Sequence, residues 1–261
     1  MGFIRGSILS FIAILLFFSL LVGNVLLTLN MSLSNQGLKE SVSSNYGEII
    51  KSLGGDQQTI NEAVKERTGE INTYCENNTN FVFSHSGYTI DIPCSVALQG
   101  GDVIIKEGIN DVIDGIYYSN YSCDSVLRCV LEKQGDPLFL FSQQANDYWR
   151  SNMYYSIAIS LFLILVMFFL VENKENLLVI SGALAILSSL PFAMMGRIFS
   201  LFDYSYLKII PILLSKSYIV FLIVFSIGVV LLLLGIAFKF FNIGEFFVEK
   251  FGGGKGKSKK K

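Results

Sequence analysis

Four long apolar runs constrain this chain more than any other feature of its sequence. A helix needs about 20 apolar residues to cross the roughly 30 Å hydrocarbon layer of a membrane. Four runs approach or exceed this length: Ser7 to Leu29, Met153 to Val171, Leu177 to Met195, and Tyr218 to Phe241. The 52% hydrophobic composition agrees, because it is too high for a soluble protein with a charged surface. The sequence therefore predicts a multi-pass α-helical membrane protein with four transmembrane helices.

The polar stretch between the first and second runs is long enough, at about 120 residues, to form a modest core of its own. We predict an N-terminal transmembrane anchor over 1–29, an extracytoplasmic domain over 30–150, a three-helix transmembrane region over 151–241 and a basic cytoplasmic tail over 242–261. The first run continues through Leu29 without a small-x-small cleavage site, which favours an uncleaved anchor over a signal peptide.

Basic residues predict the orientation of the spans. Arg5 precedes the first run, and a lysine-rich tail follows the fourth. Because cytoplasmic segments are enriched in Lys and Arg, and because four spans return the chain to its starting side, both termini are predicted to be cytoplasmic in the cell membrane. Residues 30–150 then lie outside, with sixteen acidic and eight basic side chains and a net formal charge of −8. Such an acidic domain is not expected to bind nucleic acid, because phosphate repels it.

Other residues in the polar stretch agree with an outer placement. All four cysteines lie there, as an oxidising compartment favours. Candidate glycosylation sites are Asn77 and Asn120, each in an N-x-S/T sequon. Aromatic side chains cluster where the second helix would enter the membrane, the usual position of interfacial aromatics. These residues are Tyr148, Trp149, Tyr154 and Tyr155.

The periodicity of the polar stretch predicts an α+β domain. Apolar residues from Leu38 to Leu53 recur near a 3.6-residue spacing, and Thr59 to Glu62 resembles the capping box of a second helix. Residues 81–83 and 88–92 flank a glycine-containing turn and predict a β-hairpin. Isoleucines and valine from Ile105 to Ile116 predict an amphipathic helix.

The cysteines allow three pairings. Loop length favours Cys75–Cys94 together with Cys123–Cys129, because these bridges close the shortest loops. A thiol-redox enzyme is the alternative, but such enzymes use a C-x-x-C pair and this chain has none. We therefore expect structural disulfides.

No residue pattern points to catalysis or to a cofactor. His85, the single histidine, lies in the predicted turn of the hairpin, and a zinc site needs three or four ligands. The chain has no G-x-S-x-G sequence, Walker loop, H-E-x-x-H motif or EF-hand loop. Acids at spacings of three and four, such as Asp111 and Asp114, fit the wet face of a helix. We predict that the protein is not an enzyme and holds no metal and no cofactor.

Two features of the membrane region offer contact surfaces. The third run carries a small residue at every fourth position, a seam that admits the close approach of another helix. The seam consists of Ser181, Ala185, Ser189 and Ala193. Pro191 is expected to bend this helix, and residues 197–217 to lie in the membrane interface. Lysines of the tail are candidates for binding lipid headgroups. They are Lys255, Lys257, Lys259, Lys260 and Lys261.

These features favour a non-enzymatic membrane protein whose disulfide-stabilised outer domain binds a partner or ligand, in adhesion, in assembly or as an accessory subunit. The expected partners are membrane lipids and another membrane or surface protein, or a second copy of this chain. The first alternative is an intramembrane organiser that acts through the seam. In topology alone the layout resembles claudins and tetraspanins, but it lacks the claudin pattern of loop tryptophans and cysteines, and tetraspanins place their large loop after the third span.

Overall fold

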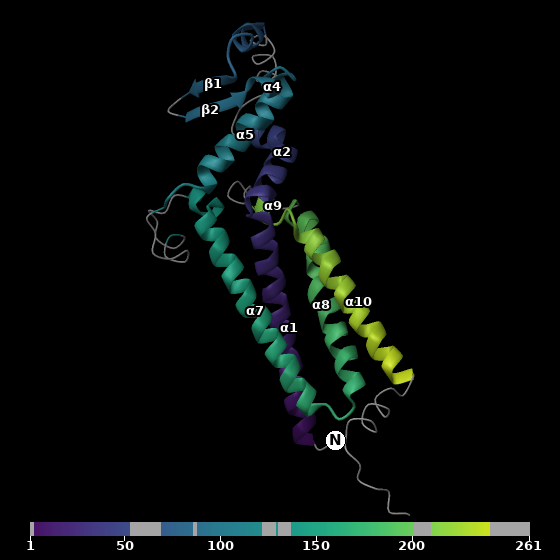
Figure 1. Cartoon of the computed structure of the whole chain (residues 1–261). Coiled ribbons are helices and arrows are strands. Elements are labelled where there is room, and N and C mark those ends of the chain that lie inside the picture. Colours follow the sequence, from purple (N-terminus) through teal and green to yellow (C-terminus); the bar gives the residue numbers. More distant parts are fainter. Residues whose placement is uncertain are drawn as a thin grey trace, which may run out of the picture. The chain divides into compact units, whose positions relative to one another are not determined.

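The computed structural model describes residues 3–52, 69–85, 88–121, 129, 137–200 and 210–240 (Figure 1). The chain divides into two compact units. Unit 1 comprises Met1–Thr28, Arg150–Tyr204 and Lys216–Lys261. Unit 2 comprises Leu29–Trp149 and Ser205–Ser215, so a segment between the third and fourth apolar runs groups with the polar stretch. The elements in chain order are α1 Phe3–Ser32, α2 Asn35–Ser52, β1 Asn80–His85, β2 Tyr88–Pro93, α4 Cys94–Ala97, α5 Gly101–Tyr117, η1 Pro137–Phe141, α7 Gln143–Leu170, α8 Lys174–Ser200, α9 Ile210–Leu213 and α10 Ser217–Phe240.

Four helices are long and apolar enough to cross a membrane, as the sequence predicts. The apolar spans are Ile4–Ser32, Gln143–Leu170, Lys174–Met195 and Ser217–Phe240. Large apolar side chains such as Phe11, Phe162 and Phe169 are more than half exposed on these helices. A surface of this kind is stable in lipid, so the protein is a membrane protein.

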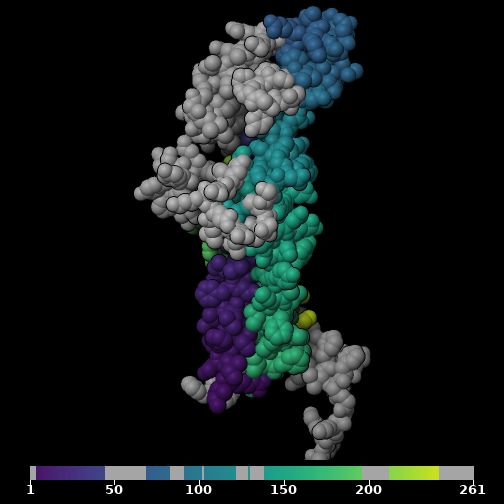
Figure 2. All heavy atoms as spheres, turned by 90° about the vertical axis from the view of Figure 1, so that its left-hand side faces the viewer, coloured from purple at the N-terminus to yellow at the C-terminus, as the bar shows by residue number. Residues whose placement is uncertain are grey.

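In unit 1, α1 and α7 lie side by side (Figure 2). The Ser19 and Ser160 hydroxyls are 2.9 Å apart, and the Ser156 hydroxyl donates to the Ser19 carbonyl at 3.0 Å. A Cβ on Gly23 would lie 3.1 Å from the Ser156 Oγ, so glycine permits the close approach. Small residues and hydroxyls therefore hold this pair, as is common where water supplies no hydrophobic driving force.

The third helix of the bundle, α8, contacts α1 through an amide. The Asn24 Nδ2 donates to the backbone carbonyl of Ser188 at 3.2 Å and lies 3.3 Å from the Ser188 Oγ. Both side chains are buried. The α8 helix continues past Pro191 to Ser200.

The fourth helix, α10, packs against α8 through glycines. A Cβ on Gly182 would lie 2.7 Å from the Gly228 carbonyl oxygen and 2.7 Å from the Leu232 backbone nitrogen. A Cβ on Gly235 would lie 2.8 Å from the Val179 nitrogen. Real Cβ atoms do not come so close to backbone atoms, so the separation of the two helices depends on the absence of side chains here.

Basic residues cap the C-terminal end of α7. The Arg5 Nε donates to the Leu170 carbonyl at 2.7 Å, and its Nη1 forms an ion pair with Glu172 at 3.1 Å. The Lys174 ammonium donates to the carbonyls of Phe168 and Val171. Positive charge is favourable at a helix C-terminus, where unsatisfied carbonyls carry partial negative charge.

In unit 2, α2 starts immediately after α1. Leu33 and Ser34 interrupt the helix, and the Ser34 Oγ accepts a hydrogen bond from the Gly37 N–H at 3.1 Å. This is the usual N-cap contact of a serine. A Cβ on Gly37 would collide with the Met31 carbonyl oxygen, so glycine allows the two helices to join through so short a link.

The predicted hairpin and amphipathic helix of unit 2 are both present. The strands pair antiparallel, with Phe81 opposite Ile92 and His85 opposite Tyr88. Gly100, with φ of 118°, forms the turn between α4 and α5, a conformation that favours glycine. Unit 2 is thus mainly helical with one small sheet. The predicted capping box at Thr59 lies outside the described residues.

Candidate functional site

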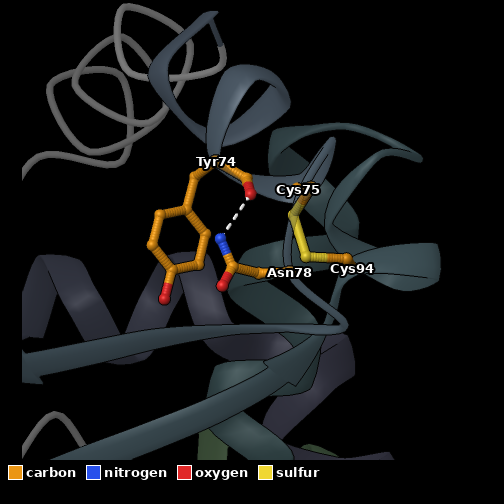
Figure 3. The surroundings of a disulfide bond; sticks show 4 residues. All are labelled: Tyr74, Cys75, Asn78 and Cys94. Carbon is orange, nitrogen blue, oxygen red and sulfur yellow. Dashed lines mark hydrogen bonds between the residues drawn. A yellow bond between two sulfur atoms is a disulfide. The ribbon is translucent and has the colours of Figure 1, made fainter.

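The disulfide between Cys75 and Cys94 links the end of the helical segment 69–75 to the start of α4 (Figure 3). The Cα atoms are 5.4 Å apart, within the usual range for a disulfide. Of the three possible pairings, loop length favours the one that contains this bridge, and the Cys75–Cys94 bridge is confirmed. Cys129 is disulfide-bonded, and Cys123 lies outside the described residues.

A small apolar core lies beside this disulfide. Ile71, Ile92, Ala97 and Ile104 are buried together, one from each of four elements, and Phe81 packs against them. The four elements are the 69–75 helix, β2, α4 and α5. We call this part of unit 2, residues 69–104, the head. Because the core is small, the covalent bond is expected to supply much of its stability.

The head presents an exposed aromatic side chain next to the disulfide. Tyr74 is 44% exposed, yet its ring packs edge-on against Phe81, with the centroids 5.8 Å apart. Figure 3 shows the Asn78 amide beside this ring; it donates to the Tyr74 carbonyl at 2.8 Å. The tyrosine is therefore both accessible and held in position, which lowers the entropy cost of a contact with another molecule.

A second core joins α2 and α5. Its buried members are Leu33, Leu38, Ile113 and Tyr117, which we call the hub. Partly buried apolar side chains pack around the hub from α1, α2, α5, η1, α7 and α9. They are Leu29, Val42, Ile109, Phe141, Trp149, Ile212 and Leu213. The α5 helix thus contributes to both the head core and the hub.

Beside the hub, one carboxylate receives two donors from α2. The Asp114 Oδ2 lies 2.6 Å from the Lys39 ammonium, and its Oδ1 accepts from the Asn35 amide at 2.6 Å. Partial burial raises the pKa of Asp114, but the contacts with Lys39 and Asn35 outweigh it and hold that pKa below its ordinary value. We call these three residues the latch.

The neighbouring carboxylate behaves in the opposite way. Burial raises the pKa of Asp111, the backbone N–H of Asp91 opposes this rise, and the charges of Glu107 and Asp114 add to it. Among the residues that the structure describes, no group of three or more His, Cys, Asp and Glu side chains is placed to hold a metal ion.

The two predicted glycosylation sites are both exposed. Asn77 lies in the turn that follows the helical segment 69–75, and Asn120 follows α5. The Thr79 side chain of the first sequon is also exposed, while the Thr79 backbone carbonyl accepts from the Cys94 N–H at 2.8 Å. An exposed turn is the setting that attachment of a glycan requires.

The aromatic residues expected at the membrane interface fall into two groups. Tyr154 and Tyr155 are more than half exposed on α7. Trp149 packs instead against the hub. The Tyr148 ring lies edge-on to the Trp149 ring, with the ring centroids 5.2 Å apart. Both also border a third small core of Cys129, Phe139 and Ala145. The rings of Tyr154 and Tyr155 are thus the more exposed pair, and contact with headgroups stays a prediction for all four residues.

Most of the small-residue seam of α8 is buried within unit 1. Ser181, Ala185 and Ser189 are buried, and Ala193 is half-buried. Little of this face is therefore left for a different protein. The five candidate lysines of the tail lie outside the described residues.

Three structural contacts have no simple signal in the sequence. The α8–α10 contact uses Gly182, Gly228 and Gly235, whereas the four-residue period points to the neighbouring seam. The latch joins residues 75 to 79 positions apart. The α9 helix packs on the hub, although its apolar residues suggest a membrane interface. Of these three contacts, only that of α9 involves a segment whose apolar character can be read from the sequence. The sequence does not show that the hub is its partner.

Comparison of the chain with protein-family models, with curated proteins and with solved structures found no match.

Proposed function

We propose that this is a non-enzymatic membrane protein that displays unit 2 outside the cytoplasm, where it binds a partner in adhesion, in assembly or as an accessory subunit. The observation that carries the proposal is the Cys75–Cys94 disulfide in a polar unit connected to membrane-length helices. Disulfides persist in oxidising compartments, so this bond supports an outer position for the head.

The distribution of charge supports the same orientation. Arg5 and Lys174 lie at the end of unit 1 where α7 terminates, and the lysine-rich tail follows α10 in the sequence. This placement of basic residues favours cytoplasmic termini in the cell membrane. The tail lysines would then lie near anionic lipid headgroups, at a gain of roughly 1 kcal/mol for each lysine close to the surface.

The exposed asparagines fit an outer domain as well. In a cell that attaches N-linked glycans, Asn77 and Asn120 would both be accessible to the transferase. A mass increase on either residue, removed by Asn77→Gln or Asn120→Gln, tests the outer placement independently of any partner.

Tyr74 is the side chain that we expect a partner to contact. Tyrosine is enriched among the residues that dominate binding energy at interfaces, and this one is exposed and held by Phe81. Tyr118 supplies a matched control, because it is also exposed and also packs edge-on against another ring, that of Tyr117.

Membrane-impermeant crosslinking on intact cells, followed by purification of the chain, tests the proposal. We expect one dominant crosslinked partner, reduced at least tenfold by Tyr74→Ala and unchanged by Tyr118→Ala. Recovery of self-crosslinks alone would instead favour a homo-oligomeric organiser. The absence of any outer crosslink, together with an unchanged phenotype after deletion of residues 38–147, would exclude a binding role for unit 2.

A further inference from the structure

The α9 helix is a short apolar segment that packs on unit 2, although it lies in the chain between α8 and α10. Ile212 and Leu213 are half-buried and pack against the hub. The α9 and α2 helices are also adjacent along their backbones (Figure 1). Residues 205–215 accordingly belong to unit 2, while both flanking helices belong to unit 1.

A helix of this length is not stable by itself. The α9 helix has four residues, too few to offset the unfavourable free energy of nucleating a helical turn. Isolated helices shorter than about 12 residues are marginal in water. The helical form of α9 therefore depends on the apolar surface to which it is docked. If the hub changed shape, α9 would lose both its packing and its helical conformation.

The latch fixes the shape of that surface. Leu38 of the hub is followed in α2 by Lys39 of the latch, and Ile113 of the hub is followed in α5 by Asp114. The ionic contact and the apolar contact thus lie on the same helical turns. Opening the contacts between Lys39, Asn35 and Asp114 would let α2 and α5 separate where Ile212 and Leu213 rest on them.

The chain connects α9 closely to α10. A turn of three residues, 214–216, separates Leu213 from the first residue of α10, Ser217, which is buried. The Ser215 N–H donates to the Ile212 carbonyl at 3.3 Å, so the turn begins within α9. Through Gly228 and Gly235, α10 in turn is in close contact with α8.

We propose that α9 is a strap whose docking depends on the latch. It is docked on the hub while the Lys39–Asp114 latch is closed and is released when the latch opens. Coupling between two sites is reciprocal. Release of the strap therefore also favours opening of the latch.

Thiol labelling of the full chain in lipid nanodiscs tests the proposal. Leu213→Cys places a thiol at the docked face, and Ser215→Cys places one at an exposed position two residues away. The unmodified chain gives the background, since its described cysteines are disulfide-bonded. We expect a water-soluble maleimide to react at least tenfold more slowly with Leu213→Cys than with Ser215→Cys.

Opening the latch should remove this protection. Adding Lys39→Ala or Asp114→Asn to Leu213→Cys is expected to raise its reaction rate at least fivefold, with the Ser215→Cys rate unchanged. Gln36→Ala is the matched control, because Gln36 forms an exposed contact with Glu40 on α2 outside the latch. It should leave both rates as they are.

Two results would overturn the strap. One is equal labelling of Leu213→Cys and Ser215→Cys in the unmodified background. The other is an unchanged Leu213→Cys rate in both latch variants, with hydrogen exchange of the β1–β2 amides confirming that unit 2 is folded.

Discussion

The two units are stabilised by different chemistry. In unit 1, α8 and α10 meet through glycines, and α1 contacts α7 and α8 through uncharged hydrogen bonds of serine and asparagine. In unit 2, a disulfide closes the head and an ion pair joins α2 to α5 beside a small apolar hub. The helix contacts of unit 1 thus depend on close backbone approach and uncharged hydrogen bonds, with the exposed Arg5–Glu172 ion pair at the end of α7. Unit 2 instead has a disulfide and an ion pair beside its small cores.

The difference follows from the solvent that each unit requires. In lipid, apolar side chains gain little by packing on one another, so close contact and interhelical hydrogen bonds supply the stability. In water, burial of apolar surface drives folding, but small cores bury too little of it and need reinforcement. The head core and the hub each have four buried residues, and each has a covalent or ionic contact beside it.

Removing the disulfide is the largest expected perturbation of unit 2. Replacement of Cys75 and Cys94 by serine frees a loop of about 20 residues and should cost about 3 kcal/mol of head stability. Native-state hydrogen exchange in detergent should then show about a hundredfold faster exchange of the β1–β2 amides, with the amides of α8 and α10 unchanged. Equal acceleration of exchange in both units would show that the stability of unit 1 depends on the disulfide of unit 2.

Adding a methyl group to the α8–α10 contact is the corresponding test of unit 1. Gly182→Ala forces a Cβ against the Gly228 carbonyl and the Leu232 nitrogen, so we expect a loss of about 1–3 kcal/mol. Gly115→Ala in α5 is the control, since nothing lies within 4 Å of its Cβ position. It should gain up to about 1 kcal/mol from helix propensity. Thermal unfolding in detergent measures both changes, and a stabilising Gly182→Ala would refute the close contact.

The latch should contribute less, because both of its charged groups are partly exposed. We expect Lys39→Ala to destabilise α2–α5 by about 0.5–1 kcal/mol, measured from hydrogen exchange of α5 amides. The folded pKa of Asp114 is below its unfolded value, so its stabilisation is present above that unfolded value of 3.8 and is lost as the pH falls through the folded pKa.

The pH dependence of the stability measures the contribution of the Asp114 carboxylate by itself. The stability difference between the unmodified chain and Asp114→Asn should be largest near neutral pH and should disappear in acid. A difference that grows on acidification would have the wrong sign for a depressed pKa and would exclude the latch as described.

The smallest effect is expected from the buried amide of unit 1. Asn24→Ala removes the uncharged hydrogen bonds that its amide donates to the carbonyl and the hydroxyl of Ser188. Such bonds in membrane proteins contribute on average about 0.6 kcal/mol. Detergent unfolding should show a change close to this value, whereas a loss above about 2 kcal/mol would mean that polar contacts, rather than glycine packing, dominate unit 1.

Local patterns account for the elements that the sequence predicts correctly. The four apolar runs, the alternation around the hairpin and the isoleucine spacing of α5 all depend on residues close together in the chain. The Cys75–Cys94 pairing also follows from a local quantity, loop length. The spacing of apolar residues places Ile105 on the inner stripe of α5, but Ile104 is the residue buried in the head core.

Contacts between distant residues account for what the sequence does not predict. The latch requires a contact between Lys39 and Asp114, and no sequence pattern around either residue identifies them as partners. The glycine contact depends on where α10 places Gly228 and Gly235, seven residues apart, opposite Gly182. Trp149 and Leu213 carry the composition of interfacial residues, but the hub offers them apolar neighbours within the protein.

The disulfide also fixes how the hairpin relates to the rest of the chain. Cys75 and Cys94 bring the two ends of an eighteen-residue insert to a Cα separation of 5.4 Å. A change of this insert that keeps the two cysteines and the core side chains Phe81 and Ile92 leaves the packing of α4 and α5 intact. In evolutionary terms the exposed positions of the insert, such as Val82, are then open to change without redesign of the helices that carry the head.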